Sequence, residues 1–472
     1  MNFLLLNQFY PPDAAPTGWY LHGLARELVR RGHSAKVFCS RRSYDGRDCF
    51  PRREKLDGVE VSRLPATGFG RRGFAGKLAD YCSFYLSLAG ALLLDRSKPD
   101  LILSLTTPPY IGLLGKAAAS KFGCRHAHWI MDLYPDVMFA HKMTPDDGLV
   151  FRFLQKLTRF QLRGAEAVIS LGPCMTEKVA AYDEEQESEV RGQRSEVRSQ
   201  RSAISGQRLE AGSLTSDLCP LTSSPSSRRT WIPLWSDPEL APWPANEMNP
   251  LRSERGWADQ DVVFLYSGNM GLGHRFAEFL EAARQLGASG PRWVFSGGGR
   301  RRREIETFAT SHPAARIEFL DYVPRNRLRS HLCAADVHLA SLDSAWQGLI
   351  VPSKIQASFA VARPVLFVGG DDCETAAWIQ ESGGGWVVGE DDLGGLLKAV
   401  EQAVNLDERQ RRGQAAFAFA RTHFQISENC AHIAQILEGK ADERSEVRDQ
   451  RSEVRGQRSE VGKICKLSQP RI

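Results

Sequence analysis

Residues 348–370, GLIVPSKIQASFAVARPVLFVGG, form a loop, helix and strand pattern that decides the fold of this chain. The helix is expected to begin at Lys354, and later residues have the apolar character of buried packing (Ala357, Phe359, Ala360 and Val361). Pro352 suits the first turn of a helix and Ser353 can cap it, where free backbone N–H groups point outward. The charge of Lys354 at this point predicts an anionic ligand. The alternative is a surface lysine that covers the helix end with its aliphatic chain.

Strands and helices alternate on both sides of this stretch. In the first part of the chain, a strand and a glycine-containing loop precede an amphipathic helix and a second strand, at 1–10, 11–18, 19–32 and 33–40. Further strands are predicted at 100–105, 126–132, 165–171, 261–268, 292–299, 315–323, 335–342, 363–370 and 384–390. This alternation is typical of doubly wound parallel sheets. The sequence therefore predicts an α/β protein with two facing Rossmann-like domains and a ligand cleft at the carboxyl ends of the strands.

Two polar segments depart from this pattern. Residues 188–208 and 445–461 repeat a seven-residue unit such as SEVRGQR, which has one apolar residue where a coiled coil needs two. Because this composition cannot bury a core, we expect a disordered insertion at 183–229 and a disordered tail at 440–472. The rest divides into an N-terminal domain, a linker, a C-terminal domain and C-terminal helices, predicted at 1–182, 230–250, 251–405 and 406–439.

The composition narrows the class of protein. With 472 residues, 42% hydrophobic residues and a net charge of +5, the chain suits a soluble protein of two or three domains. The ten cysteines show no C-x-x-C pair, so we expect reduced thiols in a cytoplasmic protein and no zinc site. The start lacks signal-peptide features, and the apolar run at 84–94, about half a membrane span, is expected to form a buried helix. Glutamates offset the arginines of the repeats, so no nucleic-acid partner is expected.

A second candidate ligand loop is SGNMGLGH at 267–274. Its glycines (Gly268, Gly271 and Gly273) follow a predicted strand and precede a predicted helix, so the backbone can approach a ligand at an anion-favouring helix start. His274 stands at the end of the loop, where it could donate a hydrogen bond to a diphosphate oxygen. The alternatives are a tight turn that binds nothing and a histidine that packs or caps the helix.

Six segments in order resemble one known family. The segments YSGNMGLGHRFAEFLEAARQL (266–286), FSGGGRRRREIE (295–306) and GLIVPSKIQASFAVARPVLFVGG closely resemble the C-terminal half of family 4 glycosyltransferases, which belong to the GT-B group. The opening at 8–38, WIMDLYPDV at 129–137 and IPLWSDPEL at 232–240 are similar to the N-terminal half and linker. The branch that looks nearest contains bacterial colanic-acid, O-antigen and exopolysaccharide sugar transferases. The resemblance covers roughly 1–182 and 230–439.

The resemblance implies a hexosyltransferase with the GT-B fold. It implies transfer of a sugar from a UDP- or GDP-linked donor in the C-terminal domain to a growing polysaccharide or lipid-linked acceptor in the N-terminal domain. Retention of the anomeric configuration is implied, with no cofactor. No metal is implied either, because the chain lacks a D-x-D in a phosphate-binding context and Lys354 would supply the positive charge.

The motifs also imply site residues. The predicted catalytic residues are Lys354 and His274, and Asp132 is predicted on the acceptor side. The predicted donor-binding residues are Gly18, Gly268, Asn269, Gly271, Gly298, Val323, Pro352, Ser353 and Glu374. Gly18 is expected to leave room for the sugar or diphosphate. Glu374 either faces the cleft or is an acid stabilised by its own helix dipole.

One departure from the family pattern concerns ribose recognition. Many family 4 enzymes carry a glutamate three residues after the lysine and another seven or eight residues before that glutamate. Here these positions hold Ala357 and about Leu349. The identity of the nucleotide therefore stays open. The missing glutamates also support an alternative function, a non-catalytic nucleotide-sugar-binding scaffold of a polysaccharide assembly complex; a nucleotide-sugar 2-epimerase with the same two-domain fold is a further alternative.

Acids and histidines of the N-terminal part follow strand ends. Asp132 could orient an acceptor hydroxyl or hold its loop, whereas Asp136 is expected to cap a helix. His126 and His128 alternate along a strand, so one of them is expected to face the cleft.

The segment at 68–85 has a basic and aromatic edge. It combines three basic residues with two phenylalanines (Arg71, Arg72, Lys77, Phe69 and Phe74). Such an edge suits an anionic lipid surface, and the alternative is a loop with solvated charges. The first interpretation predicts peripheral contact with the inner face of the cytoplasmic membrane.

Overall fold

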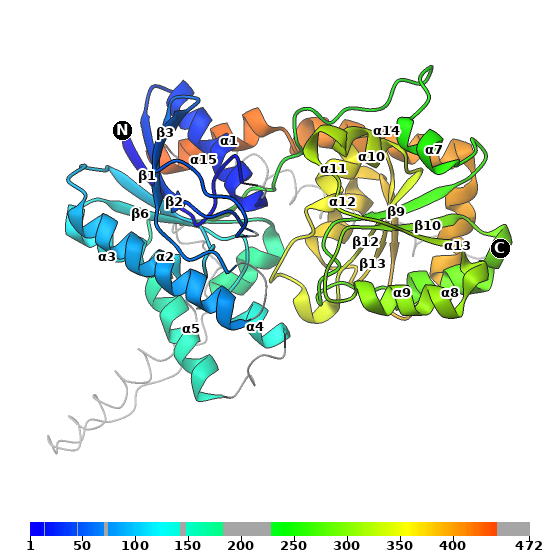
Figure 1. The fold of residues 1–472 in the computed structure, drawn as a ribbon, viewed down its shortest axis with the longest axis horizontal. Helices are drawn as coiled ribbons and strands as arrows, with labels where there is room; N and C mark the ends of the chain where they lie inside the picture. Colours follow the sequence, from blue (N-terminus) through cyan, green and yellow to red (C-terminus); the bar gives the residue numbers. More distant parts are fainter. Residues whose placement is uncertain (14, 45, 70–73, 142–147, 183–227, 441–472) are drawn as a thin grey trace, which may run out of the picture.

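The computed structural model describes residues 1–13, 15–44, 46–69, 74–141, 148–182 and 228–440, which form two α/β halves side by side (Figure 1). Each half is built on one mostly parallel sheet with helices on its faces. The predicted two-domain α/β architecture is therefore confirmed. Most of the two repeat segments, 183–227 and 441–472, lies outside the described residues.

The N-terminal half contains a sheet of eight strands in the order β3-β4-β2-β1-β5-β6-β7-β8. These strands are β1 (Asn2–Leu6), β2 (Ser34–Ser40), β3 (Arg53–Leu56), β4 (Val59–Leu64), β5 (Leu101–Ser104), β6 (Arg125–Trp129), β7 (Ala167–Ser170) and β8 (Arg229–Trp231). Only β3 and β4 pair in antiparallel fashion. The central strands are continuous apolar runs because helices bury both of their faces.

Two features of this sheet were absent from the sequence-based prediction. The β3–β4 hairpin was not predicted, and β8 lies within the range assigned to the insertion and the linker. β8 pairs in parallel with β7, so the chain returns to the first sheet after the insertion. Trp235 then packs 5.4 Å from the ring of Tyr20 and 5.8 Å from that of Trp129. The predicted linker therefore begins too early, because its first residues belong to the core of the N-terminal half.

The helices of this half are α1 (Pro16–Arg30), α2 (Phe74–Leu94), α3 (Ile111–Phe122), α4 (Asp136–Ala140) and α5 (Leu149–Leu162). The apolar run at 84–94 is the end of α2, and it is only half buried. Leu88 is fully buried, whereas Leu86 and Leu94 are 76% and 82% exposed. The prediction of a buried helix is therefore wrong for one face of α2. Among the described residues, no helix combines the length and the apolar character that crossing a bilayer requires.

The C-terminal half contains a sheet of six parallel strands in the order β11-β10-β9-β12-β13-β14. These strands are β9 (Val263–Ser267), β10 (Arg292–Ser296), β11 (Ile317–Leu320), β12 (Val337–Ser341), β13 (Val365–Val368) and β14 (Gly385–Val388). Its helices are α7 (Pro250–Arg255), α8 (Ala277–Leu286), α9 (Arg302–Ser311), α10 (Leu328–Cys333), α11 (Lys354–Ala360), α12 (Glu374–Ser382) and α13 (Leu393–Val404), with short 3-10 turns η1 (Gly287–Ser289), η2 (Pro313–Ala315), η3 (Arg325–Arg327) and η4 (Ser344–Trp346). Every strand predicted from the sequence in this half is present.

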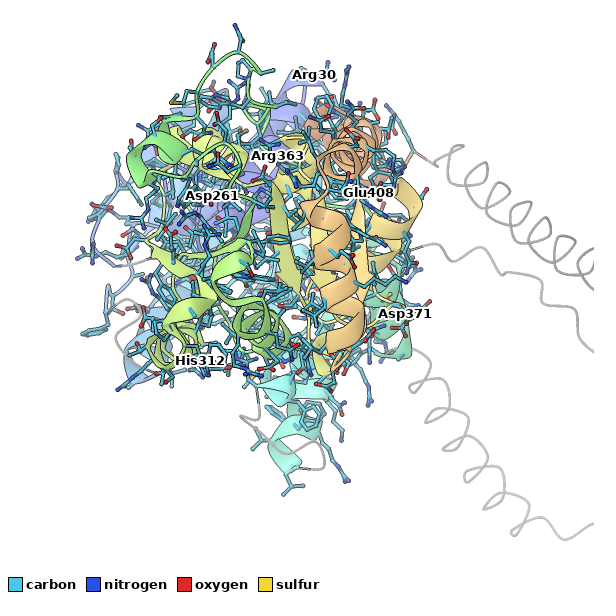
Figure 2. The ribbon with its side chains drawn as sticks, turned by 90° about the vertical axis from the view of Figure 1, so that its right-hand side faces the viewer. Arg30, Asp261, His312, Arg363, Asp371 and Glu408 are labelled. Atoms are coloured by element: carbon cyan, nitrogen blue, oxygen red, sulfur yellow. The ribbon has the colours of Figure 1, made fainter. Side chains whose placement is uncertain are left out.

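Ion pairs hold the amino ends of three strands of this sheet. Asp261, labelled in Figure 2, precedes β9 and contacts Arg292 of β10 at 2.9 Å and Arg316, just before β11, at 2.6 Å. The glycine-containing loops follow the opposite, carboxyl ends of the strands. The edge where a ligand is expected is therefore formed by loops, while the other edge is fixed by charged side chains.

The last two helices connect the halves. α14 (Leu406–His423) packs against α11, whereas α15 (Ile426–Glu438) crosses to the N-terminal half and packs along α1 (Figure 1). Glu438 accepts hydrogen bonds from Arg31 at 2.7 Å and lies 2.8 Å from Nε2 of His33. These contacts, with Lys440, hold the pKa of the Glu438 carboxyl well below its usual value.

We expect Glu438→Gln to lower the free energy of unfolding by about 2 kcal/mol at pH 7, because the amide loses charge-assisted hydrogen bonds. A carboxyl with a lowered folded pKa stabilises above its unfolded pKa, and this contribution is lost as the pH falls through the folded value. The difference from wild type should therefore shrink progressively below about pH 4.5. Denaturant unfolding at several pH values measures it. Glu428→Gln, an exposed acid on the same helix, is the control, and an equal loss in both variants would contradict this role.

Candidate functional site

The lysine segment and the glycine loop meet at the carboxyl edge of the second sheet. Lys354 is the first residue of α11, and its Nζ lies 3.4 Å from Nε2 of His274 and 4.4 Å from the centroid of the Tyr266 ring. A Cβ on Gly268 would lie 3.2 Å from Cε of Lys354. The glycine at 268 therefore lets its loop lie directly against the lysine side chain. The structure brings together both predicted catalytic residues.

Hydrogen bonding determines which nitrogen of His274 carries the proton and therefore how His274 interacts with Lys354. Nδ1 of His274 lies 2.6 Å from the carbonyl oxygen of Ser341, which can only accept, so Nδ1 carries the proton. Burial, and then the charge of Lys354, lowers the pKa of His274 from 6.5 to about 3. The imidazole is therefore neutral at pH 7, with the lone pair of Nε2 facing the lysine. His274 accepts a hydrogen bond from Lys354 and positions it; the expected donation from His274 to a diphosphate oxygen does not fit this geometry.

The ammonium group of Lys354 has no carboxylate partner among the described residues. Burial alone lowers its pKa from 10.5 to about 7. An ammonium group held in such a place is stabilised by an anion that binds beside it. A surface lysine that merely covers a helix end would keep its charge in water, so the structure argues against that alternative.

A cavity of about 250 Å³ lies beside Lys354. Four predicted residues line it, namely Gly268, Val323, Ser353 and Lys354. Ala357 also lines it, so the position of the missing family glutamate opens into this space. Apolar and aromatic side chains that the sequence-based prediction missed complete the wall: Tyr322, Leu328 and Leu332. The cavity thus offers one cationic end, several hydroxyl groups and an apolar wall.

Two glycine loops pack directly against each other at the mouth of this site. Met270 donates to the carbonyl of Gly298 at 2.6 Å, and a Cβ on Gly297 would lie 2.3 Å from the carbonyl oxygen of Gly268. Asn269 is exposed, and its amide group would lie 3.0 Å from a Cβ on Gly271. The predicted donor-binding positions Asn269, Gly271 and Gly298 therefore lie on adjacent loops after β9 and β10.

Pro352 and Ser353 precede α11 as predicted, but Ser353 does not cap the helix. Pro352 is buried, and Ser353 occupies the N-cap position of α11. The Ser353 side chain makes no capping hydrogen bond, so the predicted cap is wrong. Ser353 is an exposed residue that lines the cavity, and its side chain interacts with Tyr20 instead.

Glu374 does not line the cavity beside Lys354. It begins α12, is 1% exposed, and accepts a hydrogen bond at 2.8 Å from the backbone N–H of Met175 in the N-terminal half. Burial raises the pKa of its carboxyl. The structure corrects the predicted donor-binding role, because Glu374 holds the start of the helical segment 173–182 of the other half.

Gly18 also has a role other than the one predicted. It lies in the first turn of α1, where a Cβ would come within 2.9 Å of the carbonyl oxygen of Phe9. The absent side chain therefore makes room for the loop after β1, and that space is filled by the chain itself. The expectation that Gly18 leaves room for a sugar or diphosphate is wrong.

Asp132, the residue predicted on the acceptor side, lies among polar groups at the carboxyl edge of the first sheet. The backbone N–H groups of Met131 and Asp132 lie 3.2 and 3.3 Å from Oγ1 of Thr106. Burial raises the pKa of Asp132 from 3.8 to about 6, and the described residues offer its carboxylate no hydrogen bond. Gln8, after β1, is buried with an unpaired side-chain oxygen. Asp132 is thus a carboxyl group placed where it can contact another molecule.

The other acid and the two histidines of this region serve the fold. Asp136 begins α4 and accepts a hydrogen bond from the Tyr182 hydroxyl, while Pro135 occupies the N-cap position without a side-chain cap, so the predicted capping role of Asp136 is wrong. His126 and His128 are separated by two positions and therefore point to the same face of β6. Both are buried under α3, beside Gly115 and Gly112 respectively. The expectation that one of them faces the cleft is wrong.

The carboxyl edges of the two sheets face each other. The backbone N–H of Leu133 donates to the carbonyl of Leu349 at 3.1 Å, which joins the loop of Asp132 to the loop before Lys354. The guanidinium of Arg325 lies 3.8 Å above the ring of Trp19. The predicted acceptor residue and the predicted catalytic lysine therefore belong to loops in direct contact.

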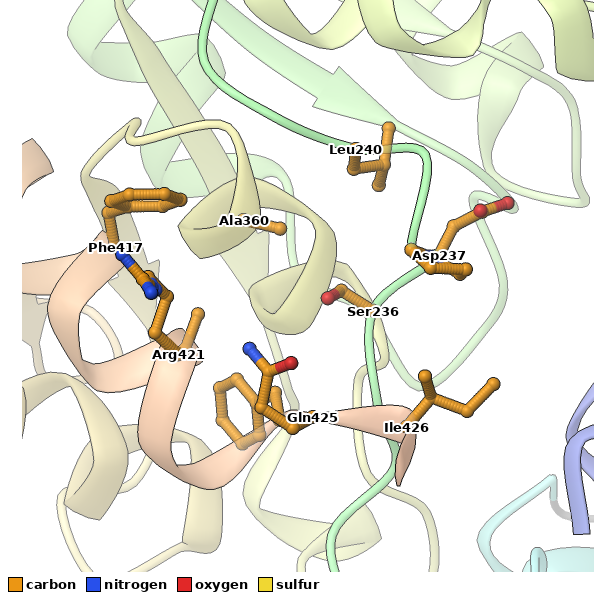
Figure 3. A pocket seen from close by; sticks show the side chains of 11 residues that line it. Ser236, Asp237, Leu240, Ala360, Phe417, Arg421, Gln425 and Ile426 are labelled. Atoms are coloured by element: carbon orange, nitrogen blue, oxygen red, sulfur yellow. The ribbon is translucent and has the colours of Figure 1, made fainter. Parts of the chain in front are cut away.

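A second cavity, of about 130 Å³, lies at the connection between the halves (Figure 3). Its lining comes from the linker, including Ser236 and Asp237, from the last turns of α14, including Phe417 and Arg421, and from the turn that leads into α15. None of the predicted site residues lines this cavity. The cavity at Lys354 is therefore the candidate functional site.

Two facing Rossmann-like halves, with the site at their opposed loop edges, define the GT-B class of glycosyltransferases. Residues 17–190 match the family model described as a glycosyl transferase 4-like domain. A curated relative, the probable glycosyltransferase WbjE of Pseudomonas aeruginosa, is 22% identical over 309 residues, which span 65% of this chain and 67% of the relative. These matches confirm the resemblance: the N-terminal half carries a glycosyl transferase 4-like domain, and the chain is similar to a probable glycosyltransferase.

Solved structures share the fold at low sequence identity. Sucrose-phosphate synthase from Thermosynechococcus elongatus has a TM-score of 0.65 and 15% identity, with 93% of this chain and 98% of that chain covered. WaaG, a glycosyltransferase involved in lipopolysaccharide biosynthesis, has a TM-score of 0.61 and 15% identity, with 92% and 99% covered. Anabaena HepE in complex with UDP has a TM-score of 0.60 and 14% identity, with 93% and 100% covered.

Proposed function

We propose that this protein transfers a sugar from a nucleotide-sugar to a lipid-linked or polysaccharide acceptor, with retention of configuration and without a metal. The observation that carries the proposal is Lys354, an ammonium group without a carboxylate partner among the described residues, beside a cavity of about 250 Å³. Solved forms of HepE contain UDP and UDP-glucose, which favours a uridine donor over a guanosine donor. The role of WaaG in lipopolysaccharide biosynthesis favours a lipid-linked acceptor at the cytoplasmic face of the membrane.

In this proposal the diphosphate lies against Lys354. The bond between the sugar and the diphosphate breaks, a bond between the sugar and the acceptor oxygen forms, and the proton of the acceptor hydroxyl passes to the leaving diphosphate. Negative charge grows on the leaving diphosphate, where a fixed ammonium group stabilises it more strongly than in water. His274 holds Lys354 in place through Nε2, and the diphosphate raises the pKa of the lysine so that it stays charged.

The two halves then have separate tasks. The apolar wall formed by Tyr322, Leu328 and Leu332 would receive the nucleoside. Asp132, on the facing edge, would accept a hydrogen bond from the acceptor hydroxyl and orient it. Because Ala357 leaves no carboxylate for the ribose, hydroxyl groups such as that of Ser353 would contact the ribose instead.

Thermal unfolding with UDP, GDP, ADP and dTDP tests the proposal. A nucleotide that binds only the folded state stabilises it by about 2.7 kcal/mol at 100 times its Kd, and we expect UDP to raise the midpoint most. Release of the nucleoside diphosphate from the matching sugar donor should then require a lipid-linked acceptor. A folded protein that none of the four nucleotides stabilises would refute the diphosphate site.

A non-catalytic scaffold is the second candidate, favoured by Ala357 and by the buried Leu349 at the positions of the family glutamates. It predicts stabilisation by a nucleotide but no release of nucleoside diphosphate with any acceptor. A 2-epimerase would release nucleotide without an acceptor. Thermal unfolding with nucleotides and release of the nucleotide with and without acceptor therefore distinguish the transferase, the scaffold and the 2-epimerase.

A further inference from the structure

Helix α5 carries large apolar side chains on its exposed face. Leu149, Phe153 and Phe160 are 85%, 60% and 56% exposed, and Val150 is 60% exposed. The spacing of Leu149, Phe153 and Phe160 places them along one face of the helix. The opposite face packs on the domain through Phe151, Thr158, Gln161 and Leu162. α5 is therefore firmly attached to the N-terminal half while it presents an apolar stripe outward.

Basic residues flank this stripe. Arg152 and Lys156 are exposed on α5, and Arg163 is exposed directly after it. The sequence of α5, LVFRFLQKLTRFQL, contains no acidic residue. Lys116 of α3 adds a charge, since its Nζ lies 4.3 Å above the Phe160 ring. The two aspartates that precede the helix in sequence, at 146 and 147, lie outside the described residues.

We propose that the α5 surface, formed by Leu149, Val150, Arg152, Phe153, Lys156 and Phe160, lies in the headgroup layer of an anionic lipid bilayer. An apolar stripe beside basic residues, on a helix that itself contains no acid, is the pattern of an interfacial helix. Its 14 residues are too few to span a membrane, which needs about 20. The apolar side chains would enter the acyl boundary, and the basic side chains would contact lipid phosphates.

Charge favours a bilayer over a second copy of the chain. A two-fold interface would place the same surface on both partners, so the basic side chains of one copy would lie against the equally basic surface of the other. Like charges at the centre of an interface oppose association. An anionic bilayer instead offers opposite charge beside an apolar layer.

The α5 surface differs from the edge at 68–85 that the sequence suggested. There Phe69 is 58% exposed, whereas Arg71, Arg72 and the side chain of Phe74 lie outside the described part of the chain. Lys77 lies 5.5 Å from the ring of Tyr81. The membrane contact therefore rests on α5, which lies at the end of the N-terminal half next to α4 (Figure 1).

The position of α4 connects this surface to the site. Phe139 of α4 packs 5.6 Å from the ring of Phe151, and His141 lies 4.4 Å from the ring of Trp346 in the C-terminal half. A bilayer at α5 would therefore present a lipid-linked acceptor near the place where the halves meet. This consequence rests on the proposed function, whereas the membrane contact itself does not.

Co-sedimentation of the full chain with vesicles tests the contact without nucleotide or acceptor. One vesicle contains phosphatidylcholine alone, and the other contains about one third phosphatidylglycerol, enough for a strongly negative surface. We expect wild type to bind the anionic vesicles. Arg152→Gln with Lys156→Gln should weaken this binding about 25-fold, since each charge contributes about fivefold. Leu149→Ser with Phe153→Ser should weaken it at least about tenfold.

The control is Leu406→Ser, a 57% exposed leucine on α14, which should bind vesicles as wild type does. Unchanged thermal midpoints show that each variant is folded. Absence of wild-type binding, or equal binding by the α5 variants, would overturn the proposal. A wild-type dimer in light scattering that becomes a monomer in the Leu149→Ser and Phe153→Ser variant would assign the surface to a second copy instead. Failure of nucleotide binding would leave the vesicle result unaffected.

Discussion

Replacing Lys354 with alanine is expected to lower kcat/KM for sugar transfer by about 100- to 1000-fold, which is the effect of removing one fixed charge from a developing anion. Lys354 is the ammonium group at the carboxyl edge of the second sheet, and His274 holds it at 3.4 Å. The measurement is the rate of nucleoside-diphosphate release from the donor in the presence of a lipid-linked acceptor. The nucleotide-induced rise of the thermal midpoint should shrink in the same variant.

Two further observations separate this role from a loss of folding. Lys398→Ala, an exposed lysine on α13, should keep wild-type activity. Burial lowers the pKa of Lys354 to about 7, below its value in the unfolded chain, so its charge destabilises the folded protein below pH 7. Lys354→Ala should therefore be at least as stable as wild type at pH 6, and any gain should fade as the pH rises toward about 10. A folded variant with more than a tenth of wild-type activity would contradict the role of the lysine.

Gly297→Ala is expected to lower the free energy of unfolding by about 3 kcal/mol, through backbone strain and a steric clash together. Gly297 has a φ of +109°, and a Cβ there would lie 2.3 Å from the carbonyl oxygen of Gly268. Relief of this contact would push the loop of Gly268 away from Lys354. Nucleotide binding should weaken along with stability, as thermal unfolding with and without UDP would show.

Gly32→Ala is the matched control for this variant. Gly32 also has a positive φ, of +84°, but no atom lies within 4 Å of a Cβ built there. The Gly32→Ala variant should lose only about 1 kcal/mol of its free energy of unfolding, which is the cost of a left-handed conformation. Its thermal midpoint should still rise with UDP. Equal losses in the two glycine variants would show that contact between the glycine loops is unimportant.

Local patterns were sufficient to predict most of the elements. Buried parallel strands are continuous apolar runs, so β5, β6, β9, β12 and β13 stood out in the sequence. The hairpin of β3 and β4 was missed because neither strand is a continuous apolar run: β3 lies at the edge of the sheet with no buried residue, and polar residues alternate with the buried positions of β4. β8 was missed because it has three residues, all partly exposed, after a long polar insertion. No short-range signal marks such a strand.

The sequence predicted the site residues whose role depends on residue type and local context. It did not predict the roles that depend on a partner far away in the sequence. Lys354 and Gly268 are recognisable because a charge and a glycine at the ends of strand–helix loops suggest an anion site. The proton position of His274 depends on Ser341, and the partner of Glu374 is Met175 in the other half. Tyr322 carried a weak signal, as an aromatic residue near the carboxyl end of the strand predicted at 315–323.

The sequence by itself therefore determined the two-domain α/β class, most of its strands and helices, and the lysine and glycine loops that predict an anion site. The fold class and its elements follow from periodicity and residue type within about 20 neighbouring positions, whereas the glycosyltransferase function was implied by the resemblance of the motifs to family 4. Only the tertiary structure decided that Gly18 serves its own loop, that Glu438 fastens the last helix to the first half, and that α5 presents an apolar stripe outward. Each of these depends on which surfaces meet, and that is settled by long-range packing and burial.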